Sequence, residues 1–205
     1  IAARQAADEA DRAIASGSPL GPLHGLPISV KDMINTAGMR TAQGSHAFAG
    51  FVPTADAEAV ARVRRAGGVV FGKTTTPEMA CKITTDSPLQ GTTRNPWNLE
   101  RTPGGSSGGA GVATAMGYGP LALTTDGAGS SRIPAAACGI IGLKPTHGAV
   151  PMELAVDLFG GISCIGLMAR TAADIELLFG IMAGPCQRDP WTMGRVGAPA
   201  CSRAS

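Results

Sequence analysis

Two serine-glycine segments and one lysine are the residues of this chain whose types could carry out chemistry. The first segment is Pro103–Gly109 (PGGSSGG), the second is Thr125–Arg132 (TDGAGSSR), and Lys31 lies upstream in the run PISVKD. A serine hydroxyl becomes a useful nucleophile only when a base removes its proton, and a neutral lysine can be that base. The glycines leave the surrounding loops open. This combination suggests acyl transfer by a serine nucleophile with a lysine base.

A histidine base and an α/β-hydrolase elbow are the main alternatives for the first segment. His147 is the only histidine downstream of both segments, and its neighbours form a turn, so we interpret it as structural or surface. The sequence GGSSG around Ser106 matches the GxSxG elbow. That elbow needs a strand directly before it, and residues 94–103, with two prolines, cannot form a central strand. The lysine-based interpretation is therefore preferred.

The second segment has the geometry of a nucleophile loop. An apolar strand at 121–124 leads into the turn 126–129, and Ser130 comes where the chain turns away. Successive N–H groups in such a turn can converge on one oxygen and form an oxyanion hole. A dinucleotide fingerprint does not fit, because Arg132 replaces the last glycine and no acidic residue follows at the expected distance. The sequence contains no P-loop motif.

The elements that position these loops alternate between helix and strand. We expect helices at 1–16, 56–66, 108–116 and from Thr171, and short helical turns near 76–78 and 134–138. We expect strands at 26–30, 69–73, 121–124 and 140–143, and extended loops at 35–55 and 84–105. The strands are continuous apolar runs, which favours an α/β fold with a mixed, largely parallel sheet flanked by helices.

Three details of these elements can be checked. Thr54 or Asp56 is expected to cap the helix at 56–66, and its basic cluster of Arg62, Arg64 and Arg65 to form a solvated face. The helix at 108–116 is rich in Gly and Ala, which predicts close packing against other backbone. The helix from Thr171 should bury one apolar stripe. That stripe contains Ile175, Leu178, Phe179 and Met182.

The composition fits a globular domain without nucleic-acid, membrane or metal binding. The 205 residues are 44% hydrophobic and 16% charged, with a net charge of +2 from scattered basic residues. No apolar run approaches the ~20 residues that span a bilayer. The five cysteines and three histidines show no metal-binding spacing, and Cys138 lies among small residues as a buried thiol would. We expect reduced thiols and a cytoplasmic location; because the chain begins at Ile1, a targeting segment is not excluded.

Several long motifs, in this order, resemble the amidase signature family. The resemblance runs from about residue 5 to about residue 190, and the separations from Lys31 to Ser106 and from Ser106 to Ser130 are typical of the family. The motifs are GPLHGLP (21–27), PISVKD (27–32), TRNPW (93–97), PGGSSGG (103–109), TDGAGSSRIPA (125–135), GLKPT (142–146) and GLMARTAAD (166–174). We therefore expect an amidase signature domain at 1–190 and an irregular tail at 191–205.

The resemblance implies a Ser-cisSer-Lys triad and a reaction without metal or organic cofactor. Ser130 would be the nucleophile, Ser106 the bridging serine after a cis peptide bond at Gly105, and Lys31 the base. Lys31 must be neutral to accept a proton, so its pKa must be lowered, and burial acts in that direction. The oxyanion would be held by backbone N–H groups of Gly127, Ala128, Gly129 and Ser130.

Further residues of the two loops are expected to support this triad. The carboxyl group of Asp126 and the guanidinium of Arg132 would fix the nucleophile loop, and Ser107 would shape the loop or bond near the site. Two positions depart from the family pattern: Ala128 stands where glycine is usual, and Ser131 stands where an apolar residue is usual. The oxyanion hole could be slightly reshaped as a result.

The length of the chain leaves three functions open. Members of the family are usually much longer, so the resemblance predicts a fragment that lacks the C-terminal half of the fold. The first function is an amide hydrolase that acts on a small-molecule substrate through an acyl-enzyme. The second is the amidase subunit of a tRNA-dependent amidotransferase, which requires partner subunits. The third is a non-catalytic scaffold, and a homodimer is left open in each case.

Overall fold

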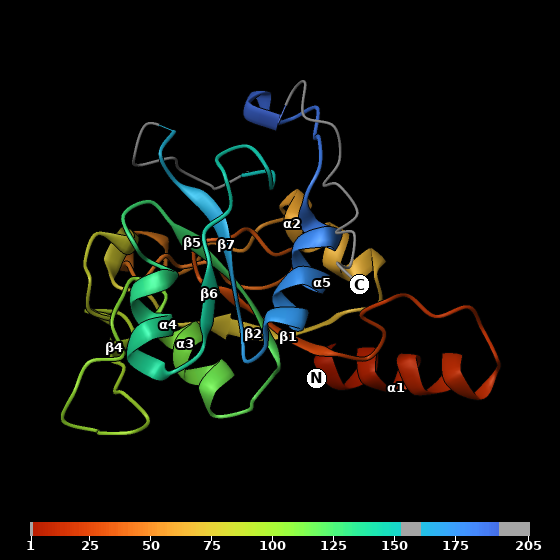
Figure 1. Ribbon diagram of the computed structural model, residues 1–205, viewed down its shortest axis with the longest axis horizontal. Coiled ribbons are helices and arrows are strands. Elements are labelled where there is room, and N and C mark those ends of the chain that lie inside the picture. The colour runs from red at the N-terminus through yellow and green to blue at the C-terminus, as the bar shows by residue number, and fades with distance from the viewer. Residues whose placement is uncertain (1, 153–160, 193–205) are drawn as a thin grey trace, which may run out of the picture.

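The core of the fold is a five-stranded sheet in the order β2-β1-β5-β7-β6 (Figure 1). This computed structural model describes residues 2–152 and 161–192. The strands are β1 (Pro27–Lys31), β2 (Val69–Thr74), β5 (Leu121–Asp126), β6 (Ile141–Leu143) and β7 (Cys164–Ala169). β1 is parallel to β2 and β5, while β7 is antiparallel to both β5 and β6. Only β7 therefore runs against the rest, which confirms the predicted mixed, largely parallel sheet.

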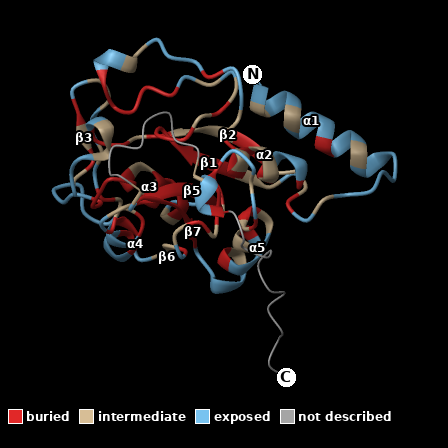
Figure 2. Cartoon of the chain, turned by 90° about the horizontal axis from the view of Figure 1, so that it is seen from above, coloured by how far each residue is buried: buried red, intermediate tan, exposed pale blue. Residues whose placement is uncertain are grey.

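Helices cover both faces of this sheet. They are α1 (Ala2–Ala15), α2 (Glu58–Arg65), α3 (Gly108–Ala115), α4 (Arg132–Cys138) and α5 (Ala172–Met182). Three short 3₁₀ turns and a two-stranded ribbon complete the described elements: η1 (His46–Phe48), η2 (Glu78–Ala80), η3 (Pro190–Thr192), β3 (Asp86–Ser87) and β4 (Gly91–Thr92). The views in Figures 1 and 2 place α3 and α4 together and α2 near α5, and these pairs are in contact.

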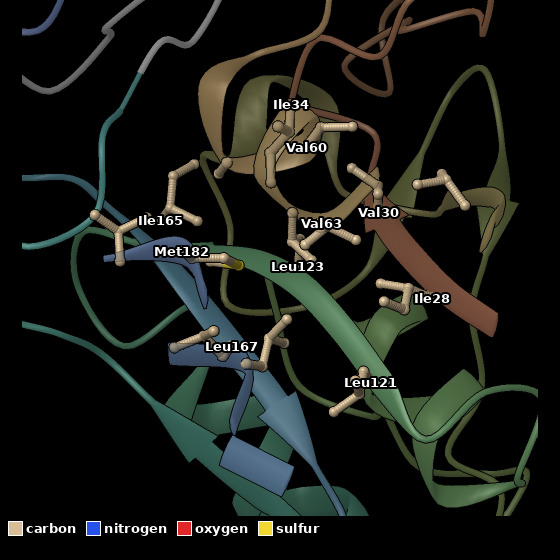
Figure 3. Packing of buried hydrophobic residues seen from close by; sticks show 14 of the residues in the cluster. Ile28, Val30, Ile34, Val60, Val63, Leu121, Leu123, Ile165, Leu167 and Met182 are labelled. Carbon is tan, nitrogen blue, oxygen red and sulfur yellow. The ribbon is translucent and has the colours of Figure 1, made fainter. Parts of the chain in front are cut away.

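The main hydrophobic core lies between the sheet and the pair α2 and α5 (Figure 3). Alternate residues of the strands point into it, because side chains alternate between the two faces of a sheet. The sheet contributes Ile28, Val30, Leu121, Leu123, Ile165 and Leu167, and the helices contribute Val60, Val63, Leu178 and Met182. All of these side chains are buried. The buried residues of α5 include three of the four in its predicted apolar stripe.

The opposite face of the sheet is covered by the small-residue helix α3. Ala110 of α3 packs with Ala122 of β5 and Met168 of β7. The predicted close backbone packing is present: a Cβ on Gly109 would lie 2.5 Å from the backbone nitrogen of Thr75. Side chains at this position would hold the helix away from the end of β2.

The structure corrects three details of the sequence-based expectations. Strand β7 was missed, although its run CIGLMA is as apolar as the strands that were predicted. Residues 84–105 contain the ribbon β3–β4 rather than only loop. The N-cap of α2 is Ala57 without a side-chain bond, while Asp56 accepts a bond from the Ala37 amide and pairs with Arg64. Residues 193–205 of the predicted tail lie outside the described residues.

The basic cluster on α2 is also only partly a solvated face. The Arg62 guanidinium donates to the carbonyl oxygens of Met182 and Ala183, both at 2.8 Å. Carbonyl groups at the end of a helix lack intrahelical partners, and an arginine can satisfy them. Arg62 thus joins α2 to the C-terminal end of α5.

None of the helices in the described parts of the chain is long and apolar enough to cross a membrane.

Substituting alanine for two helical glycines should change stability in opposite directions. Gly109→Ala should lower the free energy of unfolding by about 1–3 kcal/mol, because its Cβ would collide with the backbone of Thr75. Gly180→Ala on α5 is the matched control, since no described atom beyond its chain neighbours and its own helix backbone lies within 4 Å of its Cβ position. It should raise the free energy of unfolding by about 0.5–1 kcal/mol. Urea denaturation measures both, and a stabilising Gly109→Ala would contradict the packing of α3.

Candidate active site

The lysine and the second serine-glycine segment, whose side chains could carry out chemistry, meet at the C-terminal ends of two neighbouring parallel strands. Lys31 is the last residue of β1, and Thr125 and Asp126 end β5. Because the two strands are parallel and adjacent, their carboxyl ends open at the same edge of the sheet, where ligands bind in α/β folds. The fold thereby brings together residues that lie far apart in the sequence.

Lys31 is fully buried and is held by two hydroxyl groups. Its Nζ donates to Ser106 Oγ at 2.6 Å and to Thr125 Oγ1 at 2.7 Å. Burial lowers the pKa of Lys31 to about 7, although the negative charge of Asp126 acts in the opposite direction. A substantial fraction of Lys31 is therefore neutral near pH 7, as a general base must be.

Thr125 is a site residue that the sequence analysis missed. Its hydroxyl is the second acceptor for Lys31, and its side chain is almost completely buried. The residue lies within the motif TDGAGSSR, directly before Asp126, at the end of an apolar strand. Its position at a strand end beside Lys31 was the available signal, but recognising it required knowing that β1 and β5 are neighbours.

Ser106 occupies a tightly packed loop that hydrogen bonds link to the nucleophile loop. The peptide bond between Gly105 and Ser106 is cis, and Ser106 is fully buried. The amide of Ser107 donates to the carbonyl oxygen of Ser130 at 3.1 Å, and its hydroxyl donates to the carbonyl oxygen of Thr125 at 3.3 Å. The two serine-glycine segments of the sequence are therefore directly bonded to each other.

Ser130 lies in the turn between β5 and α4 and opens onto a cavity. The cavity has a volume of about 120 Å³, and Ser106, Thr125, Gly127 and Ala128 contribute to its walls. Ser130 is partly exposed, whereas Ser106 is not. Within the described part of the chain, the Ser130 hydroxyl makes no hydrogen bond to Ser106. Catalytic hydrogen bonds commonly tighten only when substrate binds.

Asp126 organises the backbone of the nucleophile loop. Its carboxylate accepts bonds from the amides of Gly129 (2.7 Å), Ser131 (3.1 Å) and Arg132 (3.3 Å), and from Arg132 Nε (3.0 Å) and Nη2 (2.9 Å). Burial opposes ionisation of Asp126, but the bonds from Arg132 and the amides hold its pKa below the usual value. Asp126 and Arg132 are therefore bonded to each other, and Asp126 is bonded to the loop that carries Ser130.

The same contacts change the expected oxyanion hole. The amide of Gly129 is directed at Asp126, so it is not free to bind a substrate oxygen. The amides of Gly127, Ala128 and Ser130 have no hydrogen-bond partner among the described residues. The atypical Ser131 is buried, and its hydroxyl bonds with Thr124 Oγ1 at 2.6 Å. It adds a polar anchor to strand β5 directly after Ser130.

The remaining conspicuous residues lie outside this constellation. His147 Nδ1 lies 3.2 Å from the Ser163 carbonyl oxygen, and its ring contacts Trp191 edge-on. Cys138 is buried as expected, and burial raises the pKa of its thiol to about 11. Among the residues that the structure describes, no group of three or more His, Cys, Asp or Glu side chains could hold a metal ion.

Comparison with known proteins shows similarity to one protein family. A family model described as Amidase matches residues 2–198. The chain is 46% identical to an acylamidase of Rhodococcus erythropolis, covering 93% of this chain and 40% of that protein. It is also 46% identical to a glutamyl-tRNA(Gln) amidotransferase subunit of Symbiobacterium thermophilum, covering 89% of this chain and 37% of that protein.

Solved structures of amide-cleaving enzymes are also similar to this chain. The native peptide amidase of Stenotrophomonas maltophilia superposes with a TM-score of 0.87 at 40% identity, covering 96% of this chain and 41% of that one. The 6-aminohexanoate cyclic dimer hydrolase superposes with a TM-score of 0.86 at 37% identity, covering 97% and 40%. The chain spans about two fifths of the length of the curated relatives that it matches.

Removing the charge of Asp126 should destabilise the nucleophile loop. Asp126→Asn keeps the side-chain size but loses the ion pair with Arg132 and places a donor against backbone N–H groups, which should cost about 1–3 kcal/mol. Asp86→Asn is the control, because Asp86 also pairs with a basic side chain, Lys82, but does so at the surface. It should leave the urea midpoint nearly unchanged. Equal midpoints for the two variants would contradict this role of Asp126.

Proposed function

Because the chain belongs to the amidase family, we propose that it carries the catalytic centre of an amide hydrolase with a Ser-cisSer-Lys triad. In this proposal Ser130 is the nucleophile, Ser106 is the bridge and Lys31 is the base. The observation that carries it is the buried hydrogen bond from Lys31 to Ser106 at the cavity that Ser130 shares. The amidase domain would extend over residues 1–190.

The proposed reaction moves one proton along the triad in each direction. Neutral Lys31 accepts a proton from Ser106 while Ser106 takes the proton of Ser130, and Ser130 Oγ attacks the carbonyl carbon of the amide. The proton then returns through Ser106 to the nitrogen of the leaving amine, and the carbon–nitrogen bond breaks. Water repeats the sequence on the acyl-enzyme and releases the acid. These steps use only side chains and water.

The oxyanion of the tetrahedral intermediate would be held by three amides rather than four. Those of Gly127, Ala128 and Ser130 have no competing partner within the described chain, while Gly129 supports the loop through Asp126. Preorganised donors of this kind stabilise the developing charge without moving during the reaction. Arg132 and Asp126 would act by fixing the orientation of these amides.

A second candidate is the amidase component of a tRNA-dependent amidotransferase. The 46% identity to the amidotransferase protein of Symbiobacterium thermophilum equals the identity to the acylamidase, so sequence similarity does not separate them. Amide hydrolysis that requires added partner subunits would favour this second candidate, and hydrolysis without them the first. In both candidate functions the substrate is a small-molecule amide and the location is cytoplasmic. A homodimer fits either candidate.

A fluorophosphonate probe followed by mass spectrometry tests the proposed function. We expect the label on Ser130, none in Ser130→Ala, and labelling at least about 100-fold slower in Lys31→Ala because the base is lost. Lys144→Ala is the control, since its ammonium donates to the Pro145 carbonyl oxygen outside the triad, and it should label normally. Label on Ser106 instead would overturn the assigned roles, and a complete lack of label would favour a non-catalytic scaffold.

The labelling rate should follow the protonation of Lys31. Burial lowers the pKa of Lys31 to about 7, so below that pH the lysine is charged and cannot accept a proton. We expect the rate to rise about tenfold per pH unit up to about pH 7 and then to level off. Lys31→Arg should be inactive at every pH, because the guanidinium stays protonated. A rate that is independent of pH between about 5 and 9 would contradict Lys31 as the base.

A further inference from the structure

Two isoleucines with unusually exposed side chains line the cavity at Ser130. Ile83 is 68% exposed and Ile162 is 59% exposed, and both contribute to the cavity wall together with Ser130. Ile83 precedes the ribbon β3–β4, and Ile162 precedes β7, so the two come from separate parts of the chain. Exposed apolar side chains that gather at a cavity commonly mark a binding surface.

Close packing at two glycines places the segments of both isoleucines against the loops of Ser106 and Ser130. A Cβ on Gly105 would lie 2.8 Å from the carbonyl carbon of Ile83, so the backbone of Ile83 rests directly on the loop of Ser106. A Cβ on Gly127 would lie 3.0 Å from the hydroxyl of Ser163, so the segment of Ile162 rests on the loop of Ser130. The segment of each isoleucine therefore packs against a loop that carries one of the two serines of the proposed triad.

The cavity wall carries little charge among the residues that the structure describes. Lys82 is the one charged residue among those that line the described cavity, and its Nζ lies 2.7 Å from Asp86 Oδ2. The guanidinium of Arg132 is bonded to Asp126. A carboxylate on a substrate would have to compete with Asp86 for Lys82, and the apolar side chains would remove part of its water.

We propose that Ile83 and Ile162 are specificity-determining residues that select a short, uncharged, apolar acyl group. This inference rests on the proposed function, since it names the substrate class of the same site. The two isoleucines would contact the acyl group of the substrate rather than the amine. The acyl group stays bonded to Ser130 after the amine has left, so the residues around Ser130 surround it. The cavity of about 120 Å³ suits a short acyl chain.

Three p-nitrophenyl esters with one leaving group test this selection on the chain itself. The butyrate and the hemisuccinate have acyl chains of equal length, but the second ends in a carboxylate; the acetate lacks the extra carbons. Release of p-nitrophenolate gives kcat/KM, and mass spectrometry identifies the acylated residue. We expect kcat/KM to be highest for the butyrate and to exceed the hemisuccinate value by at least about tenfold.

The double variant Ile83→Ser with Ile162→Ser should reduce the butyrate-to-hemisuccinate ratio by about tenfold, while Ser130 is still acylated. Replacing both isoleucines by leucine should keep the ratio, because the apolar surface is kept. Ile14→Ser, which changes a side chain on α1 that is 57% exposed, is the matched control and should have no effect.

The outcomes separate the inference from the proposed function. An unchanged ratio in the double serine variant, or a faster reaction with the hemisuccinate, overturns the selection by the two isoleucines and leaves the triad intact. If no ester acylates Ser130 in the unaltered chain, the proposed function fails, and the selection fails with it.

Discussion

The burial of a lysine amino group at the end of β1 is the constraint on which the rest of the site depends. A charged ammonium is costly to bury, and no carboxylate among the described residues is bonded to the fully buried Lys31. Two hydroxyl acceptors and a lowered pKa of the Lys31 amino group reduce this cost, without an ion pair among the described residues. A neutral amine that is hydrogen bonded to a serine is also what a proton relay requires. The same burial therefore sets both the stability cost and the chemical capacity of the site.

Holding that lysine in place requires unusually close contact between backbones. Gly105 fits against Thr84, and Gly109 fits against Thr75, with no room for a side chain at either position. These contacts hold the loop of Ser106 on the end of the sheet. On the opposite face the large apolar side chains of β1, β5 and β7 pack against α2 and α5. Small residues thus pack on the face that carries the loop of Ser106, and larger apolar residues form the main core on the other face.

The nucleophile loop shows how a second buried charge can be tolerated. Asp126 is ionised because five hydrogen bonds from Arg132 and from loop amides surround it. The carboxylate fixes the loop, but it also occupies the amide of Gly129. The loop therefore has one fewer free amide than the four expected for an oxyanion hole, and its backbone geometry is fixed by Asp126. The hydroxyl of Ser131, bonded to Thr124, adds a tie to β5 that an apolar residue at this position could not provide.

The sequence by itself determined the fold class and most elements, because apolar runs and glycine stops are local signals. Its long motifs also led to the proposed triad. Lys31, Ser106 and Ser130 could be named from residue type, order and resemblance. Local signals could not identify Thr125 as a partner of Lys31, Asp126 as the acceptor for Gly129, or Ile83 and Ile162 as neighbours of Ser130. Each of these depends on which strands are adjacent and how closely loops pack. Only the tertiary structure decides those distances, because they join segments that are separate in the chain.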